Sequence, residues 1–149
     1  MRIAPIFLAT ISLTVSLMAG DITGTWKLNL EKSKLHNPVQ SYQLKIEMTG
    51  PNTYRCVFDV VNAKGEKRHQ EVIRISDGME HPVEGVNVTA GRSEIVSHDL
   101  TKVIQKRNGK LFGEIDVEFT ADGKMHKVTQ TGTDDKGKPY KDLLVFERQ

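Results

Sequence analysis

Five histidines and one cysteine are the residues of this chain whose chemistry best suits metal binding or acid–base work. The histidines are His36, His69, His81, His98 and His126. None of their spacings matches a zinc motif such as His-Glu-x-x-His, and one cysteine cannot form a thiolate cluster. No Gly-x-Ser-x-Gly motif and no glycine-rich phosphate loop is present. The sequence therefore predicts no metal, no cofactor and no catalytic residue.

His69 and Glu71 are two residues apart, so both project from one face of a strand, which Ile73 and Ile75 continue. If that face lines a cavity, the pair could orient the polar head of a ligand or act as an acid–base pair. If the face meets water, the pair is a solvated edge. The sequence leaves both interpretations open.

His81 precedes Pro82 and follows the turn sequence Asp77-Gly78. Proline holds the preceding residue in extended geometry, which fixes the position of the histidine. At the rim of a barrel, such a residue could bind or gate a ligand. The alternative interpretation is that it satisfies a backbone carbonyl at a corner.

Cys56 lies between Tyr54 and Phe58 at a spacing of two, which predicts one shared strand face. We interpret it as a buried thiol that packs as a small hydrophobic residue. A reactive thiol would need a nearby cation, and Arg55 points to the opposite face.

Alternation of apolar and polar residues at the period of a strand dominates the chain and indicates antiparallel sheet with one wet face. Asn-Gly, Asp-Gly and related turn sequences separate the runs and favour tight hairpins. A helical turn is conceivable only within 30–35, because Pro38 ends that segment. The expected strands are 24–30, 41–49, 53–61, 66–75, 80–84, 91–98, 100–107, 110–119, 124–132 and 140–147.

A meander of eight to ten strands must protect its two outer edges. Closing into an up-and-down barrel removes both edges, and we favour this all-β arrangement over a two-sheet sandwich, whose crossovers are longer. Such a barrel is just wide enough to be filled or to hold one small ligand. Gly113, among large residues, hints at space inside. The expected inward set is Tyr42, Leu44, Ile46, Met48, Tyr54, Phe58, Val60, Ile73, Ile115, Val117 and Phe119.

Residues 1–20 have the features of a secretory signal peptide: Arg2 is the only charge, 3–18 are largely apolar, and Ala19-Gly20 suit cleavage. The apolar stretch is shorter than the about 20 residues of a membrane span, although an uncleaved anchor is the alternative. No cysteine follows it, which excludes lipid attachment there. We expect a mature domain over 21–149, secreted or periplasmic and without stable membrane insertion.

Without Arg2, twenty basic residues are interspersed with nineteen acidic ones. This balance argues against a nucleic-acid partner and against an acidic membrane surface. About 129 residues suffice for one domain with one core.

The opening Gly24-Thr25-Trp26-Lys27-Leu28-Asn29, after a leader and ahead of a meander, resembles a family of uncharacterised secreted bacterial lipocalin-like (calycin-type) barrels. Asp77-Gly78-x-x-His81-Pro82-Val83, the Asp122-Gly123-Lys124 turn and the ending 144–149 fit the same family. The opening also resembles intracellular fatty-acid-binding proteins. Those insert two helices after the first strand, for which 31–40 is too short, so their carboxylate site does not carry over.

The resemblance implies a structural role for the Gly-x-Trp motif. In such barrels the tryptophan plugs the closed end, and a basic side chain of the last strand lies across it. Here Trp26, with Gly24, would be covered by Arg148, or by Lys141 should Arg148 fray. Cation–π attraction of about 0.5–2 kcal/mol would seal this end, leaving a binding site toward the opposite mouth.

Three functional hypotheses follow. The leading one is a non-catalytic barrel that binds a small, mostly apolar ligand through Tyr42, Tyr54, Phe58, His69, Glu71 and His81. The second is a filled barrel that acts as a protein-interaction or envelope-associated module, with a partner the sequence does not identify. The third is a barrel enzyme that uses His69 with Glu71, or His81.

Overall fold

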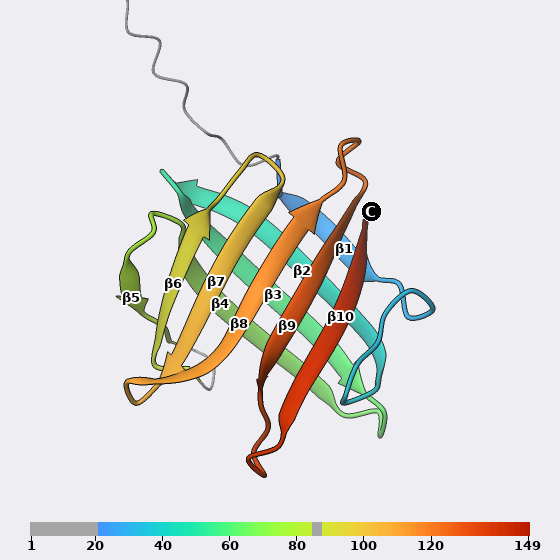
Figure 1. Cartoon of the computed structure of the whole chain (residues 1–149). Coiled ribbons are helices and arrows are strands. Elements are labelled where there is room, and N and C mark those ends of the chain that lie inside the picture. Colours follow the sequence, from blue (N-terminus) through green and yellow to red (C-terminus); the bar gives the residue numbers. More distant parts are fainter. Residues whose placement is uncertain (1–20, 85–87) are drawn as a thin grey trace, which may run out of the picture.

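Ten antiparallel strands make up the computed structural model, which describes residues 21–84 and 88–149 (Figure 1). They are β1 (Gly24–Leu28), β2 (Val39–Gly50), β3 (Thr53–Asn62), β4 (Lys67–Ile75), β5 (Glu80–Pro82), β6 (Ala90–Ile95), β7 (Leu100–Arg107), β8 (Lys110–Phe119), β9 (Met125–Thr133) and β10 (Pro139–Arg148). All ten expected strands are confirmed. Within the described ranges, no helix is long and apolar enough to cross a membrane. The predicted signal peptide, 1–20, lies outside the described residues.

The strands form one sheet in the order β4-β3-β2-β1-β10-β9-β8-β7-β6-β5. Strands adjacent in sequence pair with each other, except β4 and β5, which form the two edges of the sheet. In addition, β1 pairs with β10, where Trp26 opposes Arg148. Figure 1 shows the sheet curled round an interior, with β1–β4 behind β6–β10. The up-and-down barrel is confirmed, and the two-sheet sandwich is wrong.

The barrel is nearly closed at a seam between β4 and β6. Past the end of β4, the Ser76 and Ser93 hydroxyls hydrogen-bond at 2.8 Å, and the amide of Gly78 donates to the carbonyl of Ser93 at 2.8 Å. Both serines are buried. These two contacts join the edges at one point of the seam, in place of a continuous ladder.

Hairpin chemistry sets the path of the chain between strands. At the β7–β8 connection, Asn108 and Gly109 have φ angles of 51° and 77°. Two consecutive positive φ angles define the tight turn that matches strand twist. The predicted Asn-Gly turn is confirmed.

The segment between β1 and β2 returns to the sheet and does not form a helix pair. The amide of Lys34 donates to the carbonyl of Leu143 at 2.7 Å, and the amide of Leu143 donates back at 2.8 Å. Only turn geometry occurs over 30–32. This segment therefore extends the line of β1 along β10.

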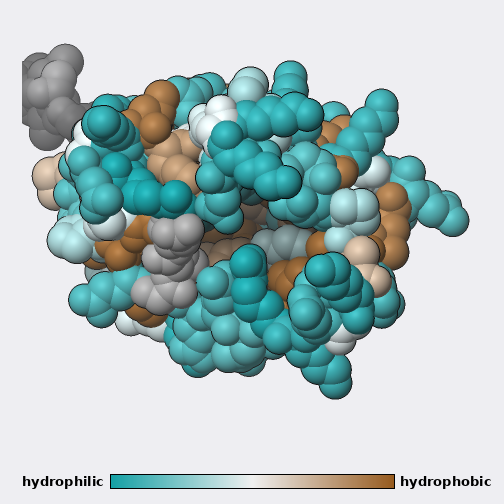
Figure 2. Space-filling view, turned by 90° about the horizontal axis from the view of Figure 1, so that it is seen from below, coloured by the Kyte–Doolittle hydropathy of each residue, from teal (hydrophilic) through white to brown (hydrophobic). Residues whose placement is uncertain are grey.

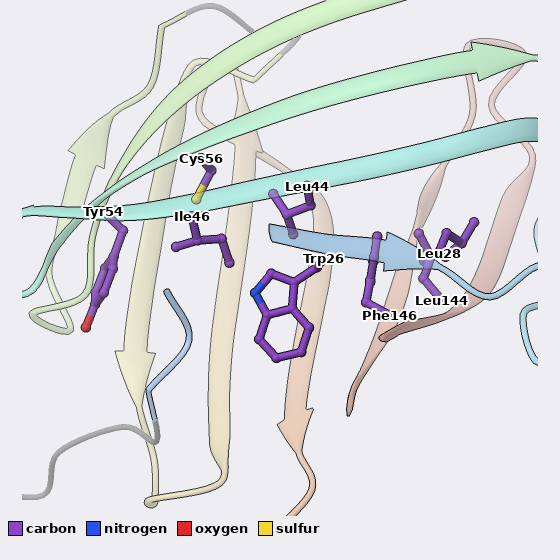
Figure 3. Packing of buried hydrophobic residues seen from close by; sticks show 8 residues of the cluster. All are labelled: Trp26, Leu28, Leu44, Ile46, Tyr54, Cys56, Leu144 and Phe146. Atoms are coloured by element: carbon purple, nitrogen blue, oxygen red, sulfur yellow. The ribbon is translucent and has the colours of Figure 1, made fainter. Parts of the chain in front are cut away.

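The packed core lies along β1, β2, β3 and β10. It consists of Trp26, Leu28, Leu44, Ile46, Tyr54, Cys56, Leu144 and Phe146. Figure 3 shows Trp26 pointing into the barrel, with Ile46 and Tyr54 on one side and Phe146 on the other. The predicted burial of Cys56 on the face of Tyr54 is confirmed.

Three expectations about inward residues need correction. Ile73 is 52% exposed, because it alternates with the buried Val72 on β4, and Met48 is 56% exposed near the end of β2. Gly113 does not mark empty space: a Cβ there would lie 2.7 Å from the carbonyl oxygen of Thr131. Close approach of β8 and β9 therefore accounts for Gly113.

Candidate ligand cavity

A cavity of about 930 Å³ occupies the barrel interior. Its lining reaches loop residues at the end where β10 begins, among them Asn37, Glu84 and Asp134. Figure 2, seen from this end, shows a hollow with hydrophilic side chains round its rim and apolar ones at depth. The cavity is therefore within the size range of small-molecule sites, about 300–1,000 Å³.

One wall of the cavity is apolar. Leu44, Ile46, Cys56, Leu144 and Phe146, from β2, β3 and β10, line it and belong to the packed core. Each of these three strands is hydrogen-bonded to a neighbouring strand on both of its sides. Burial of an apolar ligand surface against it is favourable by about 25 cal/mol per Å².

Tyr42 and Phe58, both predicted ligand contacts, also line the cavity. The Tyr42 ring meets Phe58 edge-on, with centroids 6.3 Å apart, and Phe146 at 5.2 Å. Burial raises the pKa of Tyr42 to about 12, against the opposing effect of the Arg68 and Arg74 charges. The Tyr42 hydroxyl therefore stays protonated and can donate a hydrogen bond.

Tyr54 lines the cavity nearer the closed end and is buried. Burial raises its pKa, and the charge of Asp21 adds to the effect. The neighbouring Cys56 is a free thiol whose pKa burial also raises, with Arg74 acting in the opposite direction. A raised pKa disfavours the thiolate, so Cys56 is poorly suited to be a nucleophile.

Other parts of the cavity lining are polar. Inward positions of β4, β7 and β9 carry long polar side chains: Arg68, Gln70, Arg74, Gln105, Arg107 and Gln130. The Arg107 guanidinium lies 3.9 Å from the centroid of the Phe112 ring. Gln130 donates to the Tyr140 hydroxyl at 3.1 Å. The cavity lining thus combines the apolar wall with polar and cationic side chains on the adjoining strands β4 and β9 and on β7.

At the other end of the barrel Trp26 is covered by Arg148, as the resemblance implied, behind the cavity-lining residues Ile22, Phe119 and His126. The Arg148 guanidinium lies 4.2 Å from the Trp26 ring centroid and also donates to the carbonyls of Asp21, Thr23 and Gly123. The indole N–H of Trp26 donates to a backbone carbonyl, that of Ile22, at 2.9 Å. The side chain that covers Trp26 is therefore Arg148 and not the alternative, Lys141.

Gly24 has a φ of 117°, and a Cβ at that position would lie 3.0 Å from Nη1 of Arg148. Glycine therefore leaves room for the guanidinium that covers Trp26.

His126 is a buried functional group that the sequence analysis did not single out. It is 1% exposed and packs between Trp26, at 4.3 Å between ring centroids, and Phe146, at 5.0 Å. Its Nδ1 has no hydrogen-bond partner among the described residues. Burial, with the charge of Arg148, lowers its pKa to about 4, so the ring is neutral at pH 7.

His69 and Glu71 do not line the cavity as a pair, which corrects one of the two interpretations. Alternation along β4 turns Val72 inward, so both side chains lie on the outer face. His69 Nδ1 contacts Asp59 at 2.6 Å, and Glu71 pairs with Arg55. They form an exposed ion-pair network, in which the hydrogen bond to Asp59 raises the pKa of His69.

His81 lies at the cavity wall, as predicted, on β5. Its Nε2 contacts the carboxylate of Asp77 at 2.9 Å across the preceding turn. The contact fixes the corner through a carboxylate, where the sequence had suggested a backbone carbonyl. It also gives the cavity wall one histidine–aspartate pair.

His36 belongs to a second histidine–aspartate pair, which sequence reasoning missed. Its Nδ1 lies 2.7 Å from the buried Asp142 of β10, and its ring stacks on Tyr140 with centroids 3.9 Å apart. The partners are 106 residues apart in sequence, so no local pattern could reveal them. Among residues 21–84 and 88–149, no three histidine, cysteine or acidic side chains form a group suited to a metal ion.

Comparison with solved structures identifies the fold class. The fluorescent protein UnaG superposes with a TM-score of 0.57 at 16% identity, covering 86% of this chain and 97% of UnaG. A point mutant of UnaG gives 0.59, also at 16% identity and 86% coverage, with 96% of its own chain matched. The siderocalin Ex-FABP, described as having dual ligand specificities, matches at 0.49 and 12% identity over 85% of this chain and 73% of its own.

The superposition on UnaG, together with the strand order, shows that the protein has the fold of a lipocalin-like, calycin-type up-and-down β-barrel. No protein-family model matches the chain, and no curated protein sequence matches it significantly.

Replacing Arg148 with alanine removes the stack on Trp26 and three hydrogen bonds to carbonyl oxygens. We expect the free energy of unfolding to fall by about 2–4 kcal/mol and Trp26 emission to shift to the red. Denaturant melts followed by the single tryptophan measure both. The matched control is Arg92→Ala, which removes an exposed arginine paired with Glu94. Equal losses in the two variants would contradict the role of Arg148.

The lowered pKa of the buried His126 should make the stability of the protein depend on pH. Its folded-state pKa of about 4 lies below the ordinary 6.5, so between these values the unfolded chain binds a proton that the folded chain excludes. Stability should therefore fall as the pH drops from 6.5 toward 4, with His126 contributing up to about 3 kcal/mol. His126→Phe should flatten this dependence, whereas the exposed control His98→Gln should preserve it. Parallel curves for wild type and His126→Phe would refute the assignment.

Proposed function

We propose that this protein binds a small, mostly apolar molecule inside its barrel and does not catalyse a reaction. The observation that carries the proposal is the cavity of about 930 Å³, which is open at one end and backed by the apolar wall of β2, β3 and β10. The cavity supports this proposal over the alternative hypothesis of a filled barrel that acts as an interaction module. At about 0.3 kcal/mol per non-hydrogen atom, a ligand of roughly 25 such atoms would bind with a micromolar Kd.

The groups that face the interior favour binding over catalysis. His126 is held neutral among aromatic rings, and the Cys56 thiol has a raised pKa. The His69 network lies on the outer face, where it cannot act on a molecule in the cavity. Tyr42 and Tyr54 offer hydroxyl groups that could orient a ligand without reacting with it.

The proposal can be tested with 1-N-phenylnaphthylamine, a neutral apolar fluorophore. Wild-type protein should enhance its emission and show energy transfer from Trp26. Val117→Trp, which adds bulk to the cavity lining, should weaken binding about tenfold, whereas Val96→Trp on the exposed surface should not. Failure of wild-type protein to bind the probe, or equal loss in both variants, would contradict interior binding.

We further propose that the protein is exported, to the periplasm or the medium. The support is the signal-like sequence of 1–20, together with the contacts of the chain from Asp21 onward. The carbonyls of Asp21 and Thr23 accept hydrogen bonds from Arg148. Cleavage after Ala19 or Gly20 would therefore leave every described contact in place.

Expression of the full chain in a Gram-negative bacterium tests export. Mass spectrometry of the periplasmic or extracellular fraction should find a product that begins at Gly20 or Asp21. A chain that starts directly at Asp21 should stay in the cytoplasm and fold there, which serves as the control. An intact product in the membrane fraction would instead establish an uncleaved anchor.

A further inference from the structure

Two arginines of β4 line the cavity without any partner of their own. Arg68 and Arg74 share the inward face of the strand with Gln70 and Val72. Within 21–84 and 88–149, neither guanidinium forms an ion pair or a hydrogen bond. This lack of partners is the observation that calls for an explanation.

The other arginines of the barrel show the contrast. Arg55 pairs with two glutamates, and Arg92 pairs with Glu94. Arg107 lies over a phenylalanine ring, and Arg148 is held by backbone carbonyls and Trp26. Partnered arginines are thus the rule in this molecule.

No carboxylate of the cavity lining neutralises Arg68 or Arg74. Glu71 turns outward to Arg55. Glu84, Asp134 and Asp135 belong to loops at the mouth, where Asp134 accepts hydrogen bonds from backbone amides of its own turn. The inward face of β4 therefore carries a positive charge that no residue within 21–84 and 88–149 compensates.

Tyr42 lies at the level of Arg68, whereas Arg74 lies six residues further along β4, opposite Tyr54. It opposes Val60 on β3, and Val60 opposes Arg68 on β4, so Tyr42 and Arg68 share a face two strands apart, about 10 Å. Both Arg68 and Arg74 are close enough to act on the Tyr42 hydroxyl electrostatically. That hydroxyl has no hydrogen-bond partner among the described residues.

We propose that Arg68 and Tyr42 form a subsite for the anionic group of the ligand, and that Arg74, on the same inward face of β4, adds to the positive charge that attracts it. The ligand is then an amphipathic organic anion, whose carboxylate or sulfonate meets the inward face of β4 while its apolar body lies against the core residues of β2, β3 and β10. Guanidinium and phenol donors suit such oxygens, and charge-assisted hydrogen bonds are about twice as strong as neutral ones. This inference rests on the proposed function and names the chemical class of its ligand.

Two matched fluorophores test the subsite. 1-Anilinonaphthalene-8-sulfonate carries a sulfonate that 1-N-phenylnaphthylamine lacks, on the same aromatic skeleton. We expect Arg68→Gln, Arg74→Gln and Tyr42→Phe each to weaken binding of the sulfonate about five- to tenfold. Binding of the neutral probe should change less than about twofold. Lys67→Gln, which removes a cation from the exposed outer face of β4, should leave both probes unaffected.

The outcomes separate the two proposals. Equal loss of both probes would assign Arg68 and Arg74 a structural role, and unchanged sulfonate binding would place the anion elsewhere; either overturns the subsite while interior binding stands. Failure of wild-type protein to bind either probe overturns both proposals.

If the glutamine variants do not fold, the anionic subsite can be tested by displacing the neutral probe from wild-type protein. Decanoate should displace it at lower concentration than decanol, although decanol is the more apolar of the two. Equal or better displacement by decanol would refute the anionic subsite.

Discussion

The packing at one end of this barrel depends on the guanidinium of Arg148. It covers Trp26 at 4.2 Å and holds backbone carbonyls ahead of β1 and in the β8–β9 turn. One side chain thereby joins the first strand, the last strand and a hairpin that is distant in sequence. Gly24 belongs to the same arrangement, because a larger residue would bring its Cβ to 3.0 Å from the guanidinium. The Gly-x-Trp motif thus describes a binding site for an arginine of the same chain.

Sealing one end of the barrel determines where polar residues can lie inside it. Around Trp26 the packing is aromatic and excludes water, which is why His126 is held neutral there. Strands β1, β2, β3 and β10 are hydrogen-bonded on both sides and present a continuous apolar wall. By contrast, β4 lies at the seam and opens on the cavity, so its inward arginines keep access to water or to a ligand. A guanidinium in the packed wall would lose its hydration without compensation.

Local sequence signals account for most of the fold. The Asn-Gly and Asp-Gly turns and the strand alternation predicted all ten strands, since both depend on neighbouring residues. The inward face of β4 could not be predicted in this way. Ile73 and Ile75 favoured one face, yet pairing with β3 places Cys56 opposite Val72 and so turns Arg68, Val72 and Arg74 inward. Register with a neighbouring strand therefore outweighed the hydrophobic pattern of β4 itself.

The difference between local signals and contacts distant in sequence also explains why the cavity was less predictable than the barrel. Whether a barrel of this size is filled depends on side chains that meet across the interior, such as Tyr42 with Phe146, 104 residues further along the chain. The fold is shared with UnaG at only 16% identity, so most of the sequence can differ while the fold is kept. Fold alone therefore cannot define a ligand. The ligand class must be inferred from groups in this chain that its own residues leave without a partner.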